Sequence, residues 1–175
     1  IGAVEANKGL FSYRQVKPVD TVLMRSVVEG ILKTFIFILL IMGLELVGIN
    51  CLPADPLFVI LFWLLAWSLG LGAGLFFSAA NALVLETGII VRMISFPLYI
   101  LSGVMFPLNF LPHYMQEFLL FNPVLHLVEL MRSSFFEGYR PVNGISVQYV
   151  MWWALIQIAL GLAMHLRFEF RMKAA

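Results

Sequence analysis

Three side chains that could do chemistry stand at helical spacing in the stretch FNPVLHLVELMRSSFFEGYRP, residues 121–141. His126, Glu129 and Arg132 occupy positions i, i+3 and i+6, which places neighbouring members of the set on one face of a helix. The His and Glu could bind a metal ion or move a proton, whereas the Glu and Arg could form an ion pair. Their surroundings are apolar, and an unpaired charge is costly there. We therefore expect Glu129 and Arg132 to pair with one another or with a neighbouring loop.

The other polar residues do not complete a site for enzyme chemistry. The sequence has no Gly-rich phosphate loop, no nucleophile beside a base, and no metal-ligand set beyond the isolated His126 and Glu129. We expect a chain that is not an enzyme, with no catalytic residue, no metal and no cofactor of its own.

Composition shows which solvent surrounds the chain. Of its 175 residues, 62% are hydrophobic and only 12% are charged, which is far outside the range of a water-soluble domain. The sequence predicts an integral membrane protein and gives no sign of nucleic-acid binding. The single Cys51 excludes an internal disulfide.

Four apolar stretches are long enough to cross a membrane, which takes about 20 helical residues. They are unbroken and do not alternate, so they predict helices and not strands. We expect one all-α transmembrane domain over residues 1–175, in which residues 1–6 are the end of a truncated span. The predicted spans are 23–49, 57–83, 88–111 and 148–168.

Orientation follows from Lys and Arg, which are retained on the cytoplasmic side of short loops. Nine of them fall on one predicted face, so both ends of the chain, including the tail 169–175, are expected in the cytoplasm. The opposite face has the NCLPADP loop without a basic residue, and the connection 112–147 with only Arg132 and Arg140. The nine are Lys8, Arg14, Lys17, Arg25, Lys33, Arg92, Arg167, Arg171 and Lys173.

The connection 112–147 carries charges, and the uninterrupted apolar run in its 121–141 stretch is too short for another full crossing, which would also invert the C-terminus. We predict that residues 112–138 form a re-entrant external hairpin of two short helices, broken at Asn122-Pro123 and capped by Gly138. The charged face of its second helix has two interpretations, a structural ion pair or a hinge at an external gate. The candidate gate residues are Asn122, Pro123, His126, Glu129 and Arg132.

Residues 7–22 mix basic and apolar side chains before Pro18 and Asp20, which suit the start of a new helix. This pattern predicts a cytoplasmic turn with a docking face, or else a basic segment that lies on anionic lipid headgroups.

The second predicted span carries aromatic residues that could pack or could stack on sugar rings along a wide passage. Gly70 and Gly74 follow as a small-residue face that permits close helix contact. The candidate passage residues are Phe62, Trp63, Trp67, Phe76 and Phe77.

Two other classes of membrane protein fit these residues less well. A subunit that anchors haem would need His pairs near mid-membrane, but the three histidines lie toward predicted helix ends or in the 112–147 connection. A passive channel or secondary transporter would need mid-span charges and paired broken helices. The spans instead offer Ser68, Ser78, Asn81 and Gln157.

Three stretches, IGAVEANKGLFSYRQVKPVDTVLMRSVVE, FPLYILSGVMFPLNFLP and NPVLHLVELMRSSFFEGY, resemble the permease subunit of bacterial capsular-polysaccharide ABC exporters. The resemblance runs the whole length of the chain, with the motifs in the family's order and intervals. It implies the type 2 ABC-exporter fold with six spans and an amphipathic interface helix. Compared with that family, we expect this chain to lack the interface helix, the first span and most of the second.

The resemblance also implies function and partners. The family exports lipid-linked capsular polysaccharide across the bacterial inner membrane, and this is the function we expect. The alternatives for this chain are an O-antigen or teichoic-acid exporter permease and, in a different class, a non-transport membrane anchor subunit. Two copies of the permease work with two ATPase subunits that bind ATP and Mg. A polysaccharide co-export protein, an outer-membrane channel and membrane lipid complete the expected partners. Residues 7–22 then become the helix that couples to the ATPase, through Leu10, Phe11, Tyr13, Arg14, Lys17 and Asp20.

Overall fold

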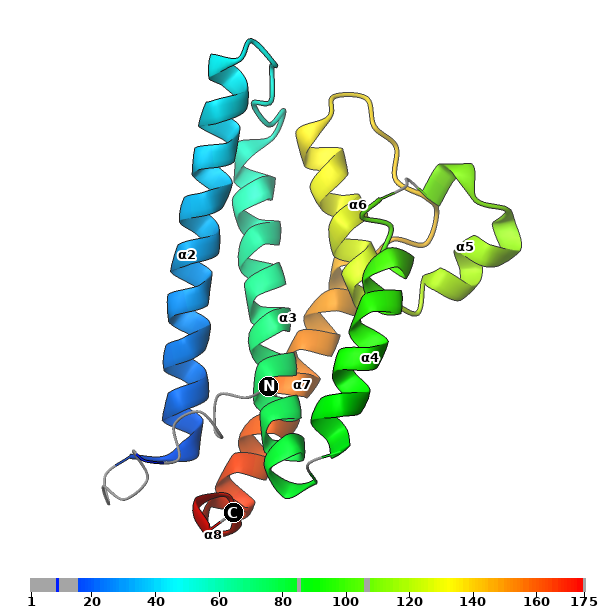
Figure 1. The fold of residues 1–175 in the computed structure, drawn as a ribbon. Coiled ribbons are helices and arrows are strands. Elements are labelled where there is room, and N and C mark those ends of the chain that lie inside the picture. The colour runs from blue at the N-terminus through cyan, green and yellow to red at the C-terminus, as the bar shows by residue number, and fades with distance from the viewer. Residues whose placement is uncertain (1–8, 10–15, 85, 106–107, 175) are drawn as a thin grey trace. The chain divides into compact units, whose positions relative to one another are not determined.

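The computed structural model describes residue 9 and residues 16–84, 86–105 and 108–174 (Figure 1). Every regular element in these ranges is a helix, as the composition predicts. The elements are α2 (Pro18–Leu46), α3 (Pro56–Leu83), α4 (Glu86–Leu101), the 3-10 turn η2 (Leu108–Phe110), α5 (His113–Leu119), α6 (Pro123–Phe135), α7 (Val147–Arg167) and α8 (Glu169–Ala174).

Three of these helices, α2, α3 and α7, are long and apolar enough to cross a membrane. They contain 29, 28 and 21 residues, and even the shortest measures about 31 Å at 1.5 Å per residue. The predicted start of a helix at Pro18 is confirmed. Residues 18–22, which the sequence assigned to the cytoplasmic turn, therefore belong to α2 itself.

The predicted span 88–111 is only partly helical. α4 has 16 residues, or about 24 Å, which is less than the ~30 Å hydrocarbon core. The helix ends at Leu101 because Gly103 takes a left-handed conformation, with φ of 73°. Pro97 lies inside α4, where its missing N–H removes one bond of the helical ladder.

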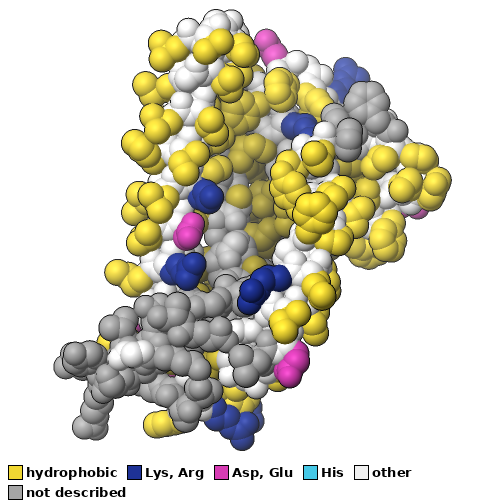
Figure 2. All heavy atoms as spheres, viewed as in Figure 1, with side chains coloured by type: hydrophobic (Ala, Val, Ile, Leu, Met, Phe, Trp, Pro, Cys, Tyr) yellow, Lys and Arg dark blue, Asp and Glu magenta, His cyan; other side chains and the backbone are white. Residues whose placement is uncertain are grey.

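The surface of α2 is apolar over much of its length. Figure 2 shows hydrophobic side chains over this helix, with charged side chains toward its lower end in that view. None of the residues in the most hydrophobic part of α2 is buried, and the side chains of Ile31, Phe35 and Leu40 are each at least 60% exposed. Such a continuous exposed apolar surface is typical of a helix that contacts lipid or another protein.

The described residues form two compact units, one drawn from 1–30, 68–96 and 152–175 and the other from 31–67 and 97–151. In the first unit, Val22 of α2 and Leu75 of α3 form the core, with Ile158 and Leu162 of α7 packed against them. Gly161 allows the close approach of α7, because a Cβ there would lie 2.6 Å from the Leu75 Cβ.

The glycines that permit this packing are not the ones that the sequence suggested. A Cβ on Gly72 would lie 2.9 Å from the Gln157 Cβ, whereas Gly70 has open space around it and Gly74 meets only Val22 at 4.0 Å. Two residues correspond to about 200° around a helix, so Gly72 faces away from Gly70. The predicted small-residue face is therefore wrong for the contacts within this chain.

In the second unit, α2 and α3 pack through an aromatic contact. Phe37 stacks on Trp63 with ring centroids 4.6 Å apart, and the Trp63 indole donates to Thr34 Oγ1 at 2.9 Å. The turn after α2 is held by Glu45, whose Oε1 accepts from Cys51 N at 2.7 Å and from Leu52 N at 3.1 Å. Glu45 is thus a structural residue that holds the turn after α2.

Candidate functional site

The connection after α4 folds into two short helices, α5 and α6, which meet at the predicted break. Asn122 is the N-cap of α6, where its side chain accepts from Val124 N at 3.0 Å, and Pro123 occupies the first turn. Pro suits this position because its missing N–H has no partner there in any helix. Leu108, Leu119 and Leu125 form the core beneath the hairpin.

Glu129 is fully buried on α6 and has both carboxylate oxygens satisfied. Arg132 Nη1 donates to Oε1 at 2.7 Å, and the Tyr139 hydroxyl donates to Oε2 at 2.8 Å. The predicted ion pair is therefore confirmed. A buried carboxylate is tolerated only when it is paired and hydrogen-bonded in this way.

The second nitrogen of Arg132 reaches the turn that follows α4. Arg132 Nη2 donates to the carbonyl oxygen of Gly103 and, at 3.2 Å, to that of Val104. Both alternatives expected for this charge occur together, since Arg132 binds Glu129 and also a neighbouring loop. The planar guanidinium can do this because it presents several donors in fixed directions. The result is a polar clamp, formed by Glu129, Arg132 and Tyr139, between α6 and the end of α4.

Tyr139 enters the clamp through a turn at Gly138. Helix α6 ends earlier than expected, with Phe136 as its C-cap, so the prediction that Gly138 caps the helix is wrong. Gly138 instead adopts φ of 80° in the following turn, where Tyr139 N donates to Phe136 O at 3.1 Å. Burial raises the pKa of Tyr139 above 10.0, and its bond to Glu129 acts in the same direction. The phenol is neutral and remains a donor.

His126 makes a second link, between the break in the hairpin and the start of α7. Its Nδ1 accepts from Ser146 N at 3.1 Å, so Nε2 carries the proton and donates to Leu120 O at 2.8 Å. Its ring lies 4.8 Å from that of Tyr149, whose hydroxyl donates to Phe121 O at 2.9 Å. Both nitrogens are used, which makes His126 a structural bridge.

No group of three or more potential metal ligands occurs in the part of the chain that the structure describes. His126 and Glu129 are each fully engaged in other bonds. At their helical spacing the two residues make two separate structural links.

The hairpin residues missed by the sequence reasoning are partners supplied from other segments. Tyr139 lies ten positions beyond Glu129, and Gly103 lies 29 positions before Arg132. Ser134 O and Phe135 O at the end of α6 accept from Asp55 N and Ala54 N, at 3.0 and 3.4 Å. Among these partners, Gly103 has a local sequence signal for its turn, since turns commonly contain Gly.

The five aromatic residues proposed for a passage differ in their contacts. They all lie on α3, but Trp63 is engaged with Phe37 and Thr34, and Phe62 is buried with its ring 5.9 Å from Phe58. Phe76 and Phe77 make an edge contact with each other at 5.3 Å. Trp67 is 37% exposed. These contacts favour the packing interpretation for Trp63 and Phe62.

Of the six residues proposed for coupling, Leu10, Phe11, Tyr13 and Arg14 lie outside the described residues. Lys17 and Asp20 lie at the start of α2, where Lys17 N donates to Asp20 Oδ2 at 3.0 Å. This is half of a capping box, because the residue at the third helical position accepts from the backbone N–H of the N-cap. Asp20 therefore stabilises the helix start.

Comparison with known proteins gives one consistent family. Residues 9–136 match the family described as ABC-2 type transporter. The chain is 36% identical over 165 residues to the polysialic acid transport protein KpsM of Escherichia coli, covering 94% of this chain and 64% of that protein.

Two further relatives are described as capsule polysaccharide export inner-membrane proteins. CtrC of Neisseria meningitidis serogroup A is 30% identical over 169 residues, covering 97% of this chain and 63% of CtrC. BexB of Haemophilus influenzae is 29% identical over 164 residues, covering 94% of this chain and 62% of BexB. This chain therefore spans a little under two thirds of the length of these relatives. Because the family match covers most of its residues and its long helices are of membrane length, the chain belongs to the ABC-2 type transporter family.

Proposed function

We propose that this chain is part of the transmembrane permease subunit of an ATP-driven exporter that moves lipid-linked capsular polysaccharide across the bacterial inner membrane. The relatives named for polysialic acid transport and capsule polysaccharide export support this function. The permease has no catalytic site of its own. ATP and Mg bind to two separate ATPase subunits, which act on a dimer of the permease.

The topology that we propose has four spans in this chain and a cytoplasmic C-terminus. Three crossings would put the basic residues before α2 and those after α7 on opposite faces, against the usual retention of Lys and Arg in the cytoplasm. α4 therefore completes the fourth crossing together with the turn and η2 that follow it. Helices α5 and α6 form a re-entrant hairpin in the outer half of the membrane.

The hairpin is the external gate of the passage in this proposal. The supporting observation is the polar clamp, in which Arg132, partly exposed and paired with the fully buried Glu129, fastens α6 to the turn after α4. An intramembrane charge pair is a candidate for function because apolar packing would fill the same space at lower cost. Movement of α4 would be transmitted through the Gly103 and Val104 carbonyls to α6.

The coupling segment 7–22, with Tyr13 and Arg14, is proposed to contact the ATPase. A polysaccharide co-export protein and an outer-membrane channel receive the polymer beyond the membrane. The aromatic side chains Trp67, Phe76 and Phe77 stay candidates for contacts with sugar rings.

The test uses the full-length permease with its ATPase in cells whose own capsule exporter is deleted. Restored surface polymer, and co-purification of the ATPase in mild detergent, would support the proposal. A soluble redox subunit in place of the ATPase would contradict it and favour a membrane anchor. Replacing Tyr13 and Arg14 by Ala and Glu should abolish export and leave the protein in the membrane.

A further inference from the structure

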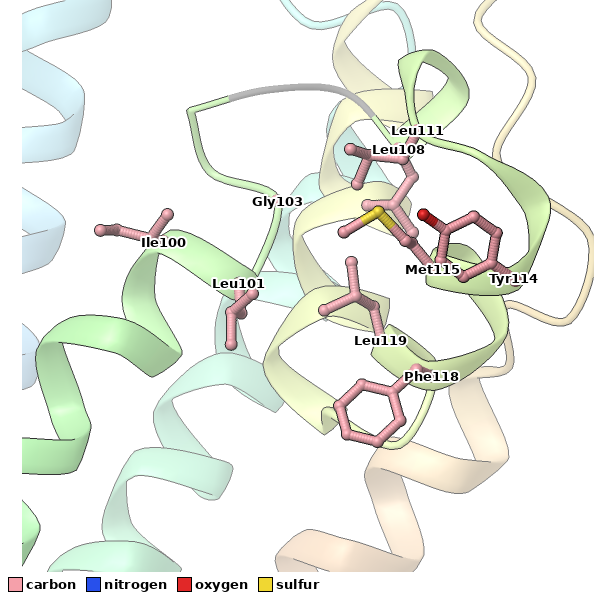
Figure 3. Close-up of a pocket in the computed structure, with 9 residues that line it drawn as sticks. All are labelled: Ile100, Leu101, Gly103, Leu108, Leu111, Tyr114, Met115, Phe118 and Leu119. Carbon is pink, nitrogen blue, oxygen red and sulfur yellow. The ribbon is translucent and has the colours of Figure 1, made fainter.

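A cavity of about 750 Å³ lies between the C-terminal end of α4 and helix α5 in the second unit. Figure 3 shows Leu101 on the α4 side and Met115, Phe118 and Leu119 on the α5 side. The nine lining residues are hydrocarbon apart from the Gly103 backbone, the Tyr114 hydroxyl and the Met115 sulfur. The volume is within the range of small-molecule sites, about 300–1,000 Å³.

Three backbone carbonyls around the cavity, those of Gly103, Leu108 and Leu111, already have partners. Leu108 O accepts from Leu111 N at 2.9 Å and from Gln116 Nε2 at 3.1 Å, and Leu111 O accepts from the same Gln116 nitrogen at 2.8 Å. Gly103 O accepts from Arg132. The described lining side chains and these three carbonyls therefore offer few hydrogen-bonding groups to a polar occupant, and an inserted peptide would leave many of its own N–H and C=O groups unpaired.

The mouth of the cavity opens on an apolar surface. Tyr114 and Phe118 are 73% and 74% exposed, and Ile100 and Leu101 at the end of α4 are each more than 40% exposed. In a membrane protein such a rim faces hydrocarbon, and a Tyr hydroxyl near it suits the headgroup level. A chain that enters from the bilayer would bury apolar surface on both sides and needs no hydrogen bond.

We infer that this cavity binds one acyl chain of a phospholipid from the surrounding membrane. The inference rests on the membrane family and on the cavity, and it does not require the export function. The bound chain would lie against Gly103, which is also the residue that Arg132 holds. Lipid occupancy and the polar clamp would thus act on the same turn from two sides.

The experiment uses the full-length permease with its ATPase in nanodiscs of phosphatidylethanolamine and phosphatidylglycerol. A trace of phosphatidylethanolamine carries a diazirine at the end of one acyl chain, and no polymer or ATP is added. After irradiation, mass spectrometry locates the labelled residues. We expect enrichment on the residues that line the cavity between 100 and 119.

Two variants and a matched control sharpen this test. Met115→Trp and Leu101→Trp fill the cavity from opposite walls, so each should reduce labelling to the background of a headgroup-labelled probe. Phe121→Trp changes an exposed hairpin residue that does not line the cavity, and labelling should be unchanged. Gel filtration shows whether a variant is misfolded. If one filling variant is, the other still tests the inference.

Several outcomes would overturn the inference. Labelling spread evenly over the apolar helices, or unchanged labelling in both filling variants, would mean that the cavity holds no lipid chain. Labelling that requires added lipid-linked polymer would assign the site to the substrate. A photoreactive residue at Met115 that captures a second permease copy, or a more N-terminal segment of the full chain, would assign it to protein. Export is not measured, so failure here leaves the proposed function untouched.

Discussion

In the α5–α6 hairpin, charged and polar side chains join separate segments, whereas α3 and α7 meet through glycine. Glu129 and Arg132 reach a tyrosine and two carbonyls in other segments. Between α3 and α7, Gly72 and Gly161 let backbones approach, and His165 Nε2 makes a polar contact with Ser78 Oγ at 3.1 Å. Among the described residues, His165 Nδ1 has no partner.

This difference shows which kind of change each region tolerates. Polar bonds depend on direction and charge, so the hairpin should fail when one charged partner is removed or reversed. A glycine contact depends on volume, so the helix pair should fail when a single methyl group is added. Substitutions of each type therefore separate the two regions.

The largest effect is expected for Glu129→Ala, which leaves Arg132 without its buried partner. Breaking one half of a buried pair costs about 3–5 kcal/mol, so surface polymer should be nearly absent at matched membrane abundance. Glu117→Ala removes an exposed carboxylate from the same hairpin and is the control. Equal, mild losses in the two variants would show that the clamp is not needed.

Reversing the pair, with Glu129→Arg and Arg132→Glu, should not restore export. A carboxylate at position 132 would face the Gly103 and Val104 carbonyl oxygens, which now accept from Arg132. An acceptor cannot replace a donor there. Substantial recovery of surface polymer would show that only the attraction within the pair matters and that the contacts to the turn are incidental.

An intermediate effect is expected for Gly161→Ala. The added Cβ would lie 2.6 Å from Leu75 Cβ and 2.8 Å from Phe76 N, and overpacking of this kind costs about 1–3 kcal/mol. Thermal unfolding of the full-length complex in detergent measures the loss. Gly70→Ala is the control, since none of the described residues would lie within 4 Å of the added atom. A similar loss at Gly70 would reveal a contact with another chain.

A smaller effect is expected for Tyr139→Phe, which removes one donor from Glu129 and keeps the ion pair. Hydrogen bonds to charged groups contribute about 1.5–3 kcal/mol, and the lower end applies because Tyr139 is partly exposed. Export should fall partially, and thermal stability should fall less than in Glu129→Ala. If export and stability fell as much as in Glu129→Ala, the Tyr139 hydroxyl and not the ion pair would be the main stabilising partner of Glu129.

The raised pKa of Tyr139 gives this variant a pH signature. A folded-state pKa above the unfolded value means that the neutral phenol is favoured by folding. The contribution of the neutral Tyr139 phenol to the free energy of unfolding is fully present below pH 10.0. It is lost as the pH rises through the higher folded-state pKa. The stability difference between wild type and Tyr139→Phe should be constant near neutral pH and shrink only under alkaline conditions.

The smallest change is expected in the labelling of Cys51, which is partly buried in the turn held by Glu45. An impermeant thiol reagent should label it in spheroplasts, because the proposed topology puts this loop, which has no basic residue, on the outer face. Glu45→Gln should raise the labelling rate slightly, since it weakens the bond to Cys51 N. Labelling only after permeabilisation would contradict the proposed topology.

Much of the fold could be predicted from local pattern. Membrane-length helices follow from apolar runs, and the start of α2 at Pro18 and the break at Asn122-Pro123 follow from the chemistry of Pro and Asn. The end of α4 could not be placed, because the FPLYILSGVMFPL sequence stays apolar beyond the point where Gly103 turns the chain.

Only those contacts of the site that join residues close together in the sequence could be predicted. The Glu129–Arg132 pair is three residues apart, and helical spacing is enough to predict it. Tyr139, Gly103 and Ser146 come from segments whose distance in space no local pattern encodes. The same limit explains the choice of Gly70 and Gly74, since the sequence gives the small residues but not the face that meets α7.

The bridge made by His126 has a consequence for biosynthesis. Its Nδ1 needs Ser146 N, twenty positions further along the chain, and the hairpin break also needs the Tyr149 hydroxyl. The ribosome delivers these residues after the hairpin, at about 5–20 residues per second. Until the first turn of α7 emerges, the nascent hairpin therefore has two acceptors without these partners, the ring nitrogen His126 Nδ1 and the backbone carbonyl oxygen of Phe121. Insertion of the last helix and closure of the hairpin become a single late step of assembly.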